Sequence, residues 1–236
     1  MKTAFITRLT QPMFYAIVAS VVIVTLLLVA FFTMEPRIGH AVDSNDFRIR
    51  QTITDETSFL VQPSNVTMIG SISGVTGGTA NGSTTFAVIS NNADGYTVSI
   101  AYENNPGLYA MRGDTTDSEA IRDYSGTLSG GMQPSYNFTA STAAQFAYTV
   151  DSTTDGDTDQ SFRDNGSACN QAGGTGNSLC WMAPSTTAYT IVDRGSSANT
   201  GATSTISFRV VVPSGSDPAV TADTYTATAT LTLLAQ

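Results

Sequence analysis

The chain has a long apolar segment near its start, and this segment constrains on which side of a membrane the remaining residues fold. Lys2 and Arg8 are followed by an uncharged run from Leu9 to Met34. A basic start followed by an apolar core is the pattern of an export segment whose positive end stays in the cytoplasm. The run therefore predicts an N-terminal hydrophobic helix and places the remaining residues on the far side of the membrane.

Two fates of this segment remain open. Gly39 and Ala41 supply the small residues that a signal peptidase requires, and Pro36 ends the helix before them, which favours cleavage after Ala41. The run is also longer than an ordinary signal core of roughly 7 to 15 residues, and ~20 helical residues span a bilayer. Residues 1–41 are thus predicted to be an export signal or an N-terminal membrane anchor. Membrane contact is expected only through residues 9–34.

The exported part is acidic and contains no lysine. The chain has 10 Lys and Arg and 19 Asp and Glu, of which Lys2, Arg8, Arg37 and Glu35 lie in the first 41 residues. Residues 42–236 therefore carry 7 Arg and 18 acidic side chains, a formal charge of −11. Because such a surface repels phosphate backbones and anionic lipid headgroups, we expect no nucleic-acid partner.

The remaining sequence alternates apolar and polar residues with period two, which is typical of β-strands. Strands are predicted around Phe47–Ile53, Val66–Ile72, Thr84–Val88, Tyr96–Tyr102, Phe146–Val150, Tyr189–Ile191, Ile206–Val212 and Tyr225–Leu233. The turn Asn91–Gly95 predicts a hairpin between the third and fourth of these. The last strand is expected to pair within the chain, although pairing with a neighbour's extended segment is an alternative.

Many short strands with Gly, Asn and Pro between them predict an all-β fold. We expect an antiparallel two-sheet β-sandwich, immunoglobulin-like or jelly-roll-like, after the N-terminal helix. Residues 42–236 are long enough for a single domain. Residues 103–135 and 151–185 break the alternation and are predicted to be long loops, where a binding surface is expected.

Cys169 and Cys180 are the only cysteines. An even number of cysteines in an exported chain predicts a disulfide. A metal pair formed by these cysteines would lack further ligands, since the exported part has no histidine. The bond is therefore expected to be structural.

Alternating carboxylates at Asp155, Asp157 and Asp159 are candidate calcium ligands, with Asp151 and Asp164 as additional ligands. A turning chain that offers several carboxylate oxygens suits a hard divalent cation. The pattern departs from an EF-hand loop, because Gln160 replaces the turn glycine and Gly166 the bidentate Glu. A solvated acidic loop is the alternative interpretation.

Trp181 has two interpretations. The indole ring is a candidate ligand contact that could stack on a sugar, but a Trp beside a disulfide is more often packed against it.

The single histidine, His40, precedes the exported domain, so nucleophile systems that need histidine are absent from that domain. Many acidic pairs exist and none is singled out, so no enzyme is expected.

Two segments resemble known exported β-sandwiches of bacteria. ADTYTATATLTLLAQ, residues 222–236, resembles the closing strand of the WxL-domain, spore-coat-U-like and fimbrial-subunit groups. SNNADGYTVSI, residues 90–100, is similar to a hairpin of the same groups. Residues 223–227 also resemble the tyrosine-corner strand of immunoglobulin domains, where a further strand follows. Trp181 is followed by Met and Ala, so the W-x-L motif itself is missing.

The resemblance implies a bacterial protein outside the cell that works by display, adhesion or assembly. We therefore expect a non-enzymatic cell-surface structural or adhesive protein whose partners are other surface subunits or a surface glycan. The alternative is a carbohydrate-binding module that uses the two long loops, with or without calcium as a cofactor. A hydrolase is the third alternative.

Overall fold

The computed structural model describes residues 11–34, 48–103, 109–116, 119–125, 134–176 and 178–236. The chain divides into two units, Met1–Thr52 and Ile53–Gln236. The predicted cleavage position after Ala41 and the predicted strand start at Phe47 lie outside the described residues. The described residues are mostly β, with one helix near the N-terminus, which confirms the expected fold class at that level.

The first unit contains helix α1, Gln11–Thr33. Pro12 suits the first turn, because its missing N–H would have no helical partner there. Almost all of its described side chains are exposed. The helix is long and apolar enough to cross a membrane, and a signal sequence would have the same properties.

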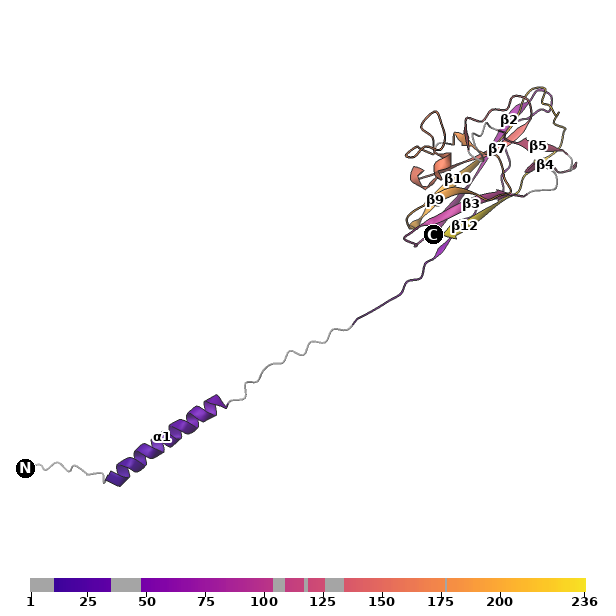
Figure 1. Ribbon diagram of the computed structural model, residues 1–236. Coiled ribbons are helices and arrows are strands. Elements are labelled where there is room, and N and C mark those ends of the chain that lie inside the picture. The colour runs from indigo at the N-terminus through magenta and orange to yellow at the C-terminus, as the bar shows by residue number, and fades with distance from the viewer. Residues whose placement is uncertain (1–10, 35–47, 104–108, 117–118, 126–133, 177) are drawn as a thin grey trace, which may run out of the picture. The chain divides into compact units, whose positions relative to one another are not determined.

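The second unit holds the strands, which form three sheets among the described residues (Figure 1). Two short 3₁₀ turns, η1 and η2, cover Asp155–Asp157 and Gln160–Phe162. The strands in chain order are β1 Thr57–Val61, β2 Gly78–Ser90, β3 Tyr96–Tyr102, β4 Met111–Gly113, β5 Ala120–Asp123, β6 Ser135–Tyr136, β7 Gln145–Ser152, β8 Cys180–Trp181, β9 Tyr189–Arg194, β10 Ala198–Val212, β11 Tyr225–Thr226 and β12 Ala229–Ala235.

The largest sheet has the strand order β1-β2-β10-β7-β5-β4-β11, and a second sheet has the order β12-β3-β9. The pairs are antiparallel except β5 with β7, which is parallel. Strands β6 and β8 form a small third sheet. The last strand, β12, pairs with β3, as expected for pairing within the chain.

Alternate side chains from the two larger sheets are buried in one hydrophobic cluster. In β3 the buried positions are Tyr96, Val98, Ile100 and Tyr102, in agreement with the predicted alternation. In β10 the predicted even-numbered face supplies Ile206, Val210 and Val212. The other strand residues of this core are Phe86, Val88, Met111, Ile121, Phe146, Tyr148, Val150, Cys180, Ile191, Val192 and Ala198.

The predicted hairpin between residues 84 and 102 is wrong. Strand β2 lies between β1 and β10, whereas β3 lies between β12 and β9 in another sheet. The turn between them therefore crosses from one sheet to the other. Gly95 has φ +91°, and an added Cβ would lie 1.7 Å from the carbonyl oxygen of Arg194, so the crossing requires glycine.

Other predicted strands also differ from the structure. Residues 48–56 contain no strand, and the first strand of this unit is β1. Residues 66–72 form no regular strand, and Ile69 makes an isolated antiparallel bridge to Asn81 of β2. The predicted strand 225–233 is divided into β11, which pairs with β4, and β12, which pairs with β3. Alternation identifies which side chains are buried, but it does not identify the partner strand.

The two predicted loops contain ordered elements. Strands β4, β5 and the start of β6 lie within 103–135, so this region is not a single loop. Both 3₁₀ turns and β8 lie within 151–185. The short strands were missed because two to four residues are too few to show a period.

The predicted disulfide between Cys169 and Cys180 is present, with 5.8 Å between the Cα atoms. Cys180 is fully buried in the core, and Cys169 lies partly buried against it. The bond therefore fastens the Gly-rich segment between them to β8. A disulfide also fits an oxidising compartment outside the cytoplasm.

Replacing Cys169 by serine is expected to lower the free energy of unfolding by about 3 kcal/mol, because it frees a loop of about a dozen residues in the unfolded chain. The β-sheets should remain, since the strands do not depend on this bond. Urea unfolding followed by circular dichroism measures the change, and reduced wild-type protein serves as the control. A variant that is unfolded without urea would contradict this prediction.

Candidate functional site

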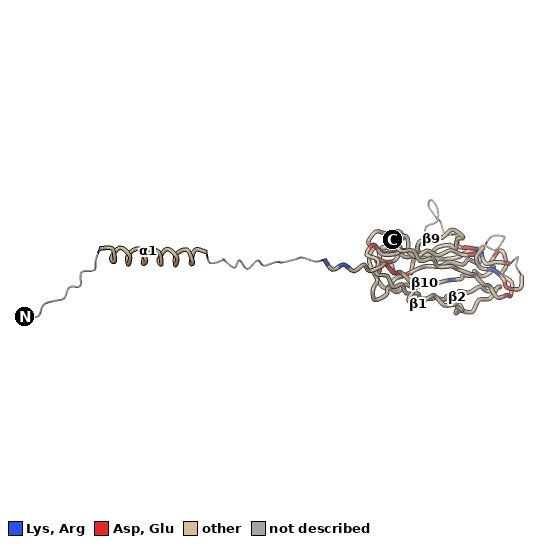
Figure 2. The backbone as a smooth tube through the Cα atoms, turned by 90° about the horizontal axis from the view of Figure 1, so that it is seen from below, with Lys and Arg blue, Asp and Glu red and all other residues tan. Residues whose placement is uncertain are grey.

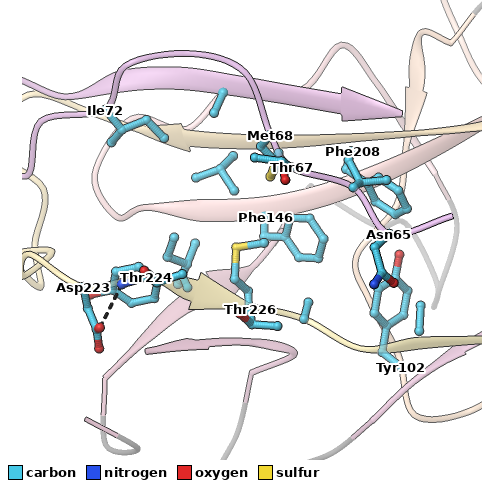
Figure 3. A pocket seen from close by; sticks show the side chains of 18 of the residues that line it. Asn65, Thr67, Met68, Ile72, Tyr102, Phe146, Phe208, Asp223, Thr224 and Thr226 are labelled. Carbon is cyan, nitrogen blue, oxygen red and sulfur yellow. Dashed lines mark hydrogen bonds between the residues drawn. The ribbon is translucent and has the colours of Figure 1, made fainter. Parts of the chain in front are cut away.

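A pocket with a volume of about 980 Å³ opens between two segments of the β-rich unit (Figure 3). Residues 63–68 and Ile72 line one side, and residues 220–227 with Ala229 and Leu231 line the other. Core side chains from several strands close its inner end, including Phe146, Phe208 and Tyr102. We call this pocket the edge groove, because β11 and β12, which line its second side, are edge strands of their sheets.

The first side runs along the part of β2 that β1 does not reach, because β1 pairs only with residues 87–90 of β2. The N–H of Ser64 donates to Thr84 Oγ1 at 2.8 Å. Further along, Ile69 and Asn81 exchange two backbone hydrogen bonds of 2.6 and 2.9 Å. Val66, Met68 and Ile72 are half-buried, whereas the residues between them are mostly exposed. This segment therefore behaves as an irregular strand with one face toward the groove.

The second side is formed by β11 and the start of β12. Asp223 Oδ2 accepts a 3.0 Å hydrogen bond from the N–H of Thr115, and the backbone of Thr224 accepts one from Asp114. Gly113 permits this arrangement, because a Cβ there would lie 2.5 Å from Asp223 Oδ2. β12 pairs with β3 on one side, and no described strand pairs with its other side.

The inner end of the groove is apolar and incompletely covered. Phe208 is half-buried, although Ile206 and Val210 on the same face of β10 are 2 % exposed. The Phe208 ring stacks on Phe146, with 6.2 Å between the ring centroids. The hydroxyl of Tyr102 is buried without a hydrogen-bond partner, and burial raises the pKa of Tyr102 well above its usual value. The inner end of the groove thus offers apolar surface, whereas the Tyr102 hydroxyl is buried away from solvent.

The groove lies apart from the surface that the sequence predicts for binding. The two long loops are the expected binding surface, whereas the groove is lined mainly by residues of the predicted strands. The apolar–polar alternation of residues 66–72 is the sequence signal that points to the first side of this groove.

The candidate calcium ligands do not converge in the structure. Asp155 is exposed, Asp157 forms a salt bridge with Arg194, and Asp159 caps η2 by accepting from the N–H of Ser161 at 2.9 Å. Among the described residues, no three His, Cys, Asp or Glu side chains are grouped closely enough to hold a metal ion. Calcium binding would therefore require a rearrangement of this segment.

Asp151 and Asp164 each have one buried carboxylate oxygen without a hydrogen-bond partner. Burial raises the pKa of Asp151, and the nearby Asp155 raises it further. The other Asp164 oxygen accepts a 2.7 Å hydrogen bond from the N–H of Gly166.

Trp181 is buried, with 3 % of its surface exposed. It packs with Phe138 and Ala147, and the Arg209 guanidinium lies 4.3 Å from the centre of its ring. Cys180 faces the main core, so the two neighbours belong to different clusters, as alternation along a strand requires. The side chain thus contributes to packing, although not against the disulfide as expected.

Acidic residues occur at several places along the chain of the β-rich unit (Figure 2). Asp123 lies half-buried on β5. Burial raises the pKa of Asp123 to about 6, although a 3.0 Å hydrogen bond from the N–H of Ala110 opposes the change. Asp123 is not among the residues that line the edge groove.

Comparison with protein-family models, with curated proteins and with solved structures found no match for this chain. Its function is therefore inferred from its own residues.

Calcium is expected to bind weakly to residues 151–164, with a dissociation constant of ~10⁻⁴ to 10⁻³ M, because Asp157 and Asp159 must give up existing partners. Millimolar calcium should raise the melting temperature more than sodium chloride of equal ionic strength. Asp155→Asn should reduce this gain, and it is a cleaner probe than Asp157→Asn, which also removes the partner of Arg194. Equal shifts with the two salts would contradict the calcium hypothesis.

Stability should depend on pH through Asp123. Its folded-state pKa of about 6 exceeds the unfolded value of about 3.9, so the folded protein binds the proton more tightly. Acidification from pH 7 to 5 should therefore stabilise wild-type protein relative to Asp123→Asn, which does not titrate. Urea unfolding of both proteins at each pH isolates this effect from that of Asp151. A difference that does not change with pH would contradict it.

Proposed function

We propose that this chain is a non-enzymatic structural or adhesive protein of a bacterial cell surface. The observation that carries the proposal is the order of its parts: an apolar N-terminal helix followed by a β-rich unit fastened by a disulfide. The helix fits an export signal or anchor, and the disulfide fits an oxidising compartment. The net negative, lysine-free composition of residues 42–236 argues against nucleic acid as a partner.

We also propose that the two larger sheets pack face to face as a β-sandwich. Support comes from the single core cluster to which both sheets contribute alternate side chains. In sandwiches the inward residues of two sheets interdigitate in this way. The β2-to-β3 crossing, which connects the two sheets directly, is consistent with the same architecture.

Display or assembly is favoured over glycan binding. A glycan-binding site usually offers an exposed aromatic face, whereas Trp181 lies beneath Arg209 and beside Phe138. The exposed features of the β-rich unit are instead sheet edges and an apolar groove, which suit contact with another polypeptide. Partners of the proposed protein are therefore other surface subunits.

The export step can be tested in a bacterial host that expresses the full chain. Antibodies against residues 53–236 should label intact cells, and mass spectrometry of unreduced protein should find Cys169 joined to Cys180. The double variant Val24→Arg/Leu27→Arg should abolish labelling, because each Arg costs about 2.5–3.5 kcal/mol at the centre of a membrane helix. Val24→Ile/Leu27→Ile is the matched control. Label that appears only after lysis, with both thiols free, would refute the proposal.

A further inference from the structure

We propose that Asn165 is a site of self-catalysed modification. The backbone nitrogen of Gly166 attacks the Asn165 side-chain amide, Asp164 acts as the base, and ammonia leaves as a succinimide ring closes. This reaction belongs to the loop 164–168 and does not depend on the proposed surface function. Its support is that hydrogen bonds of this loop place a nucleophile, a base and several donors around one amide.

The nucleophile is the peptide nitrogen between Asn165 and Gly166. Both residues are exposed, and Gly166 has φ +90°, a conformation that glycine adopts without strain. Apart from its chain neighbours, no described heavy atom lies within 4 Å of the position that a Cβ of Gly166 would occupy. Attack of this nitrogen on Asn165 Cγ closes a five-membered ring within one chain, so no second reactant has to be bound.

Asp164 holds a base next to this nitrogen. The N–H of Gly166 donates to Asp164 Oδ1 at 2.7 Å. Asp164 is 2 % exposed, and two backbone hydrogen bonds to Thr175, of 3.0 and 3.1 Å, fix its position. Its other carboxylate oxygen is buried without a hydrogen-bond partner among the described residues. A general base must lie within hydrogen-bond reach of the proton that it removes, and this carboxylate does.

Donors surround the carbonyl oxygen of the Asn165 side chain. Oδ1 accepts from the N–H of Ser167 at 3.1 Å, from the Ser167 hydroxyl at 3.0 Å and from the N–H of Ala168 at 3.0 Å. Negative charge develops on this oxygen as the nitrogen attacks, and preorganised donors stabilise it. The side-chain nitrogen instead donates to Gln171 Oε1 at 3.3 Å. These contacts determine which end of the amide receives the charge and which end departs.

The reaction is balanced without an oxidant, a reductant or a cofactor. The bond from the Gly166 nitrogen to Asn165 Cγ forms, and the bond from Cγ to Nδ2 breaks. The proton passes from Gly166 to Asp164 and then to the departing nitrogen, which leaves as ammonia, so Asp164 becomes a carboxylate again. Water later opens the ring and leaves aspartate or isoaspartate at position 165. The loop then carries one more negative charge in place of a neutral amide.

A second Asn-Gly pair of the chain lacks this arrangement. Asn81 and Gly82 lie in β2, where Gly82 is opposite Phe208 of β10. Asn81 Oδ1 accepts from Nε of Arg209 at 2.7 Å, and among the described residues no carboxylate accepts from the N–H of Gly82. A Cβ at Gly82 would lie 2.5 Å from Val66 Cγ1, so this strand is closely covered. The two pairs have the same residue types in different surroundings, which makes Asn81 a matched control.

Folded full-length protein in detergent provides the first test, incubated at mildly alkaline pH in calcium-free buffer. Tryptic peptides 164–194 and 51–112 contain the two sites. Mass spectrometry of the reduced peptides should show loss of ammonia, and later its replacement by water, at Asn165 at least about 10-fold faster than at Asn81. Equal rates at the two sites, or an unchanged Asn165, would overturn the proposal.

Two variants test the roles of the neighbouring groups. Asp164→Asn keeps an oxygen in place but removes the base, and it should slow the reaction at Asn165 at least about 10-fold. Ser167→Ala removes one donor from an exposed position and should slow it roughly 2- to 10-fold, whereas Ser167→Thr keeps the hydroxyl and should react like wild type. Circular dichroism verifies that each variant is folded. Wild-type rates for Ser167→Ala, or for folded Asp164→Asn, would refute the mechanism.

Comparison with the unfolded chain measures what the fold contributes. Wild-type protein in guanidinium chloride keeps the Asn165–Gly166 sequence but loses the fixed contacts with Asp164 and Ser167. Folded protein should therefore form the ring at Asn165 faster than unfolded protein, whereas Asn81 should react faster in the unfolded chain. A rate at Asn165 that is equal or higher in denaturant would show that the loop does not promote the reaction, and the proposal would fail.

Discussion

The shared hydrophobic core is the constraint on which the rest of this structure depends. Val98 and Ile100 of β3 and Ile206 and Val210 of β10 are almost completely buried, although their strands lie in different sheets. Burial of such side chains is the main favourable term in folding. It determines which face of each strand points inward, and it requires the chain to cross between sheets at Gly95 rather than fold back as a hairpin.

The same core explains why one edge is open. β2 and β10 have 13 and 15 residues, whereas β3 has 7, and part of the apolar face of the two longer strands lines the groove. Residues 63–72 and 220–231 cover this part incompletely, which leaves Phe208 half-buried and the Tyr102 hydroxyl without a partner. A buried polar group without a hydrogen bond is unfavourable, and exposed apolar surface beside it favours an additional contact. The edge groove therefore lies where the cover of this apolar face is incomplete.

The acidic segment shows how tertiary contacts change the meaning of a pattern. Alternating aspartates suggested a common ligand, but Asp157 turns to Arg194 of β9 and Asp159 caps a local 3₁₀ turn. Spacing along the chain does not reveal either partner, because Arg194 is distant in sequence and capping depends on local backbone conformation. Trp181 illustrates the same point, because the guanidinium group of Arg209, from β10, lies over its indole ring.

The sequence by itself determined the properties that depend on local pattern. The apolar run predicted α1, the even cysteine count predicted the disulfide, and period-two alternation predicted the buried faces of β3 and β10. Only the tertiary structure decided the pairing of strands, the division of residues 225–233 between two sheets, the position of the edge groove and the separation of the acidic residues. The physical reason is that alternation specifies a face, whereas hydrogen-bond partners are set by the whole chain competing for one core.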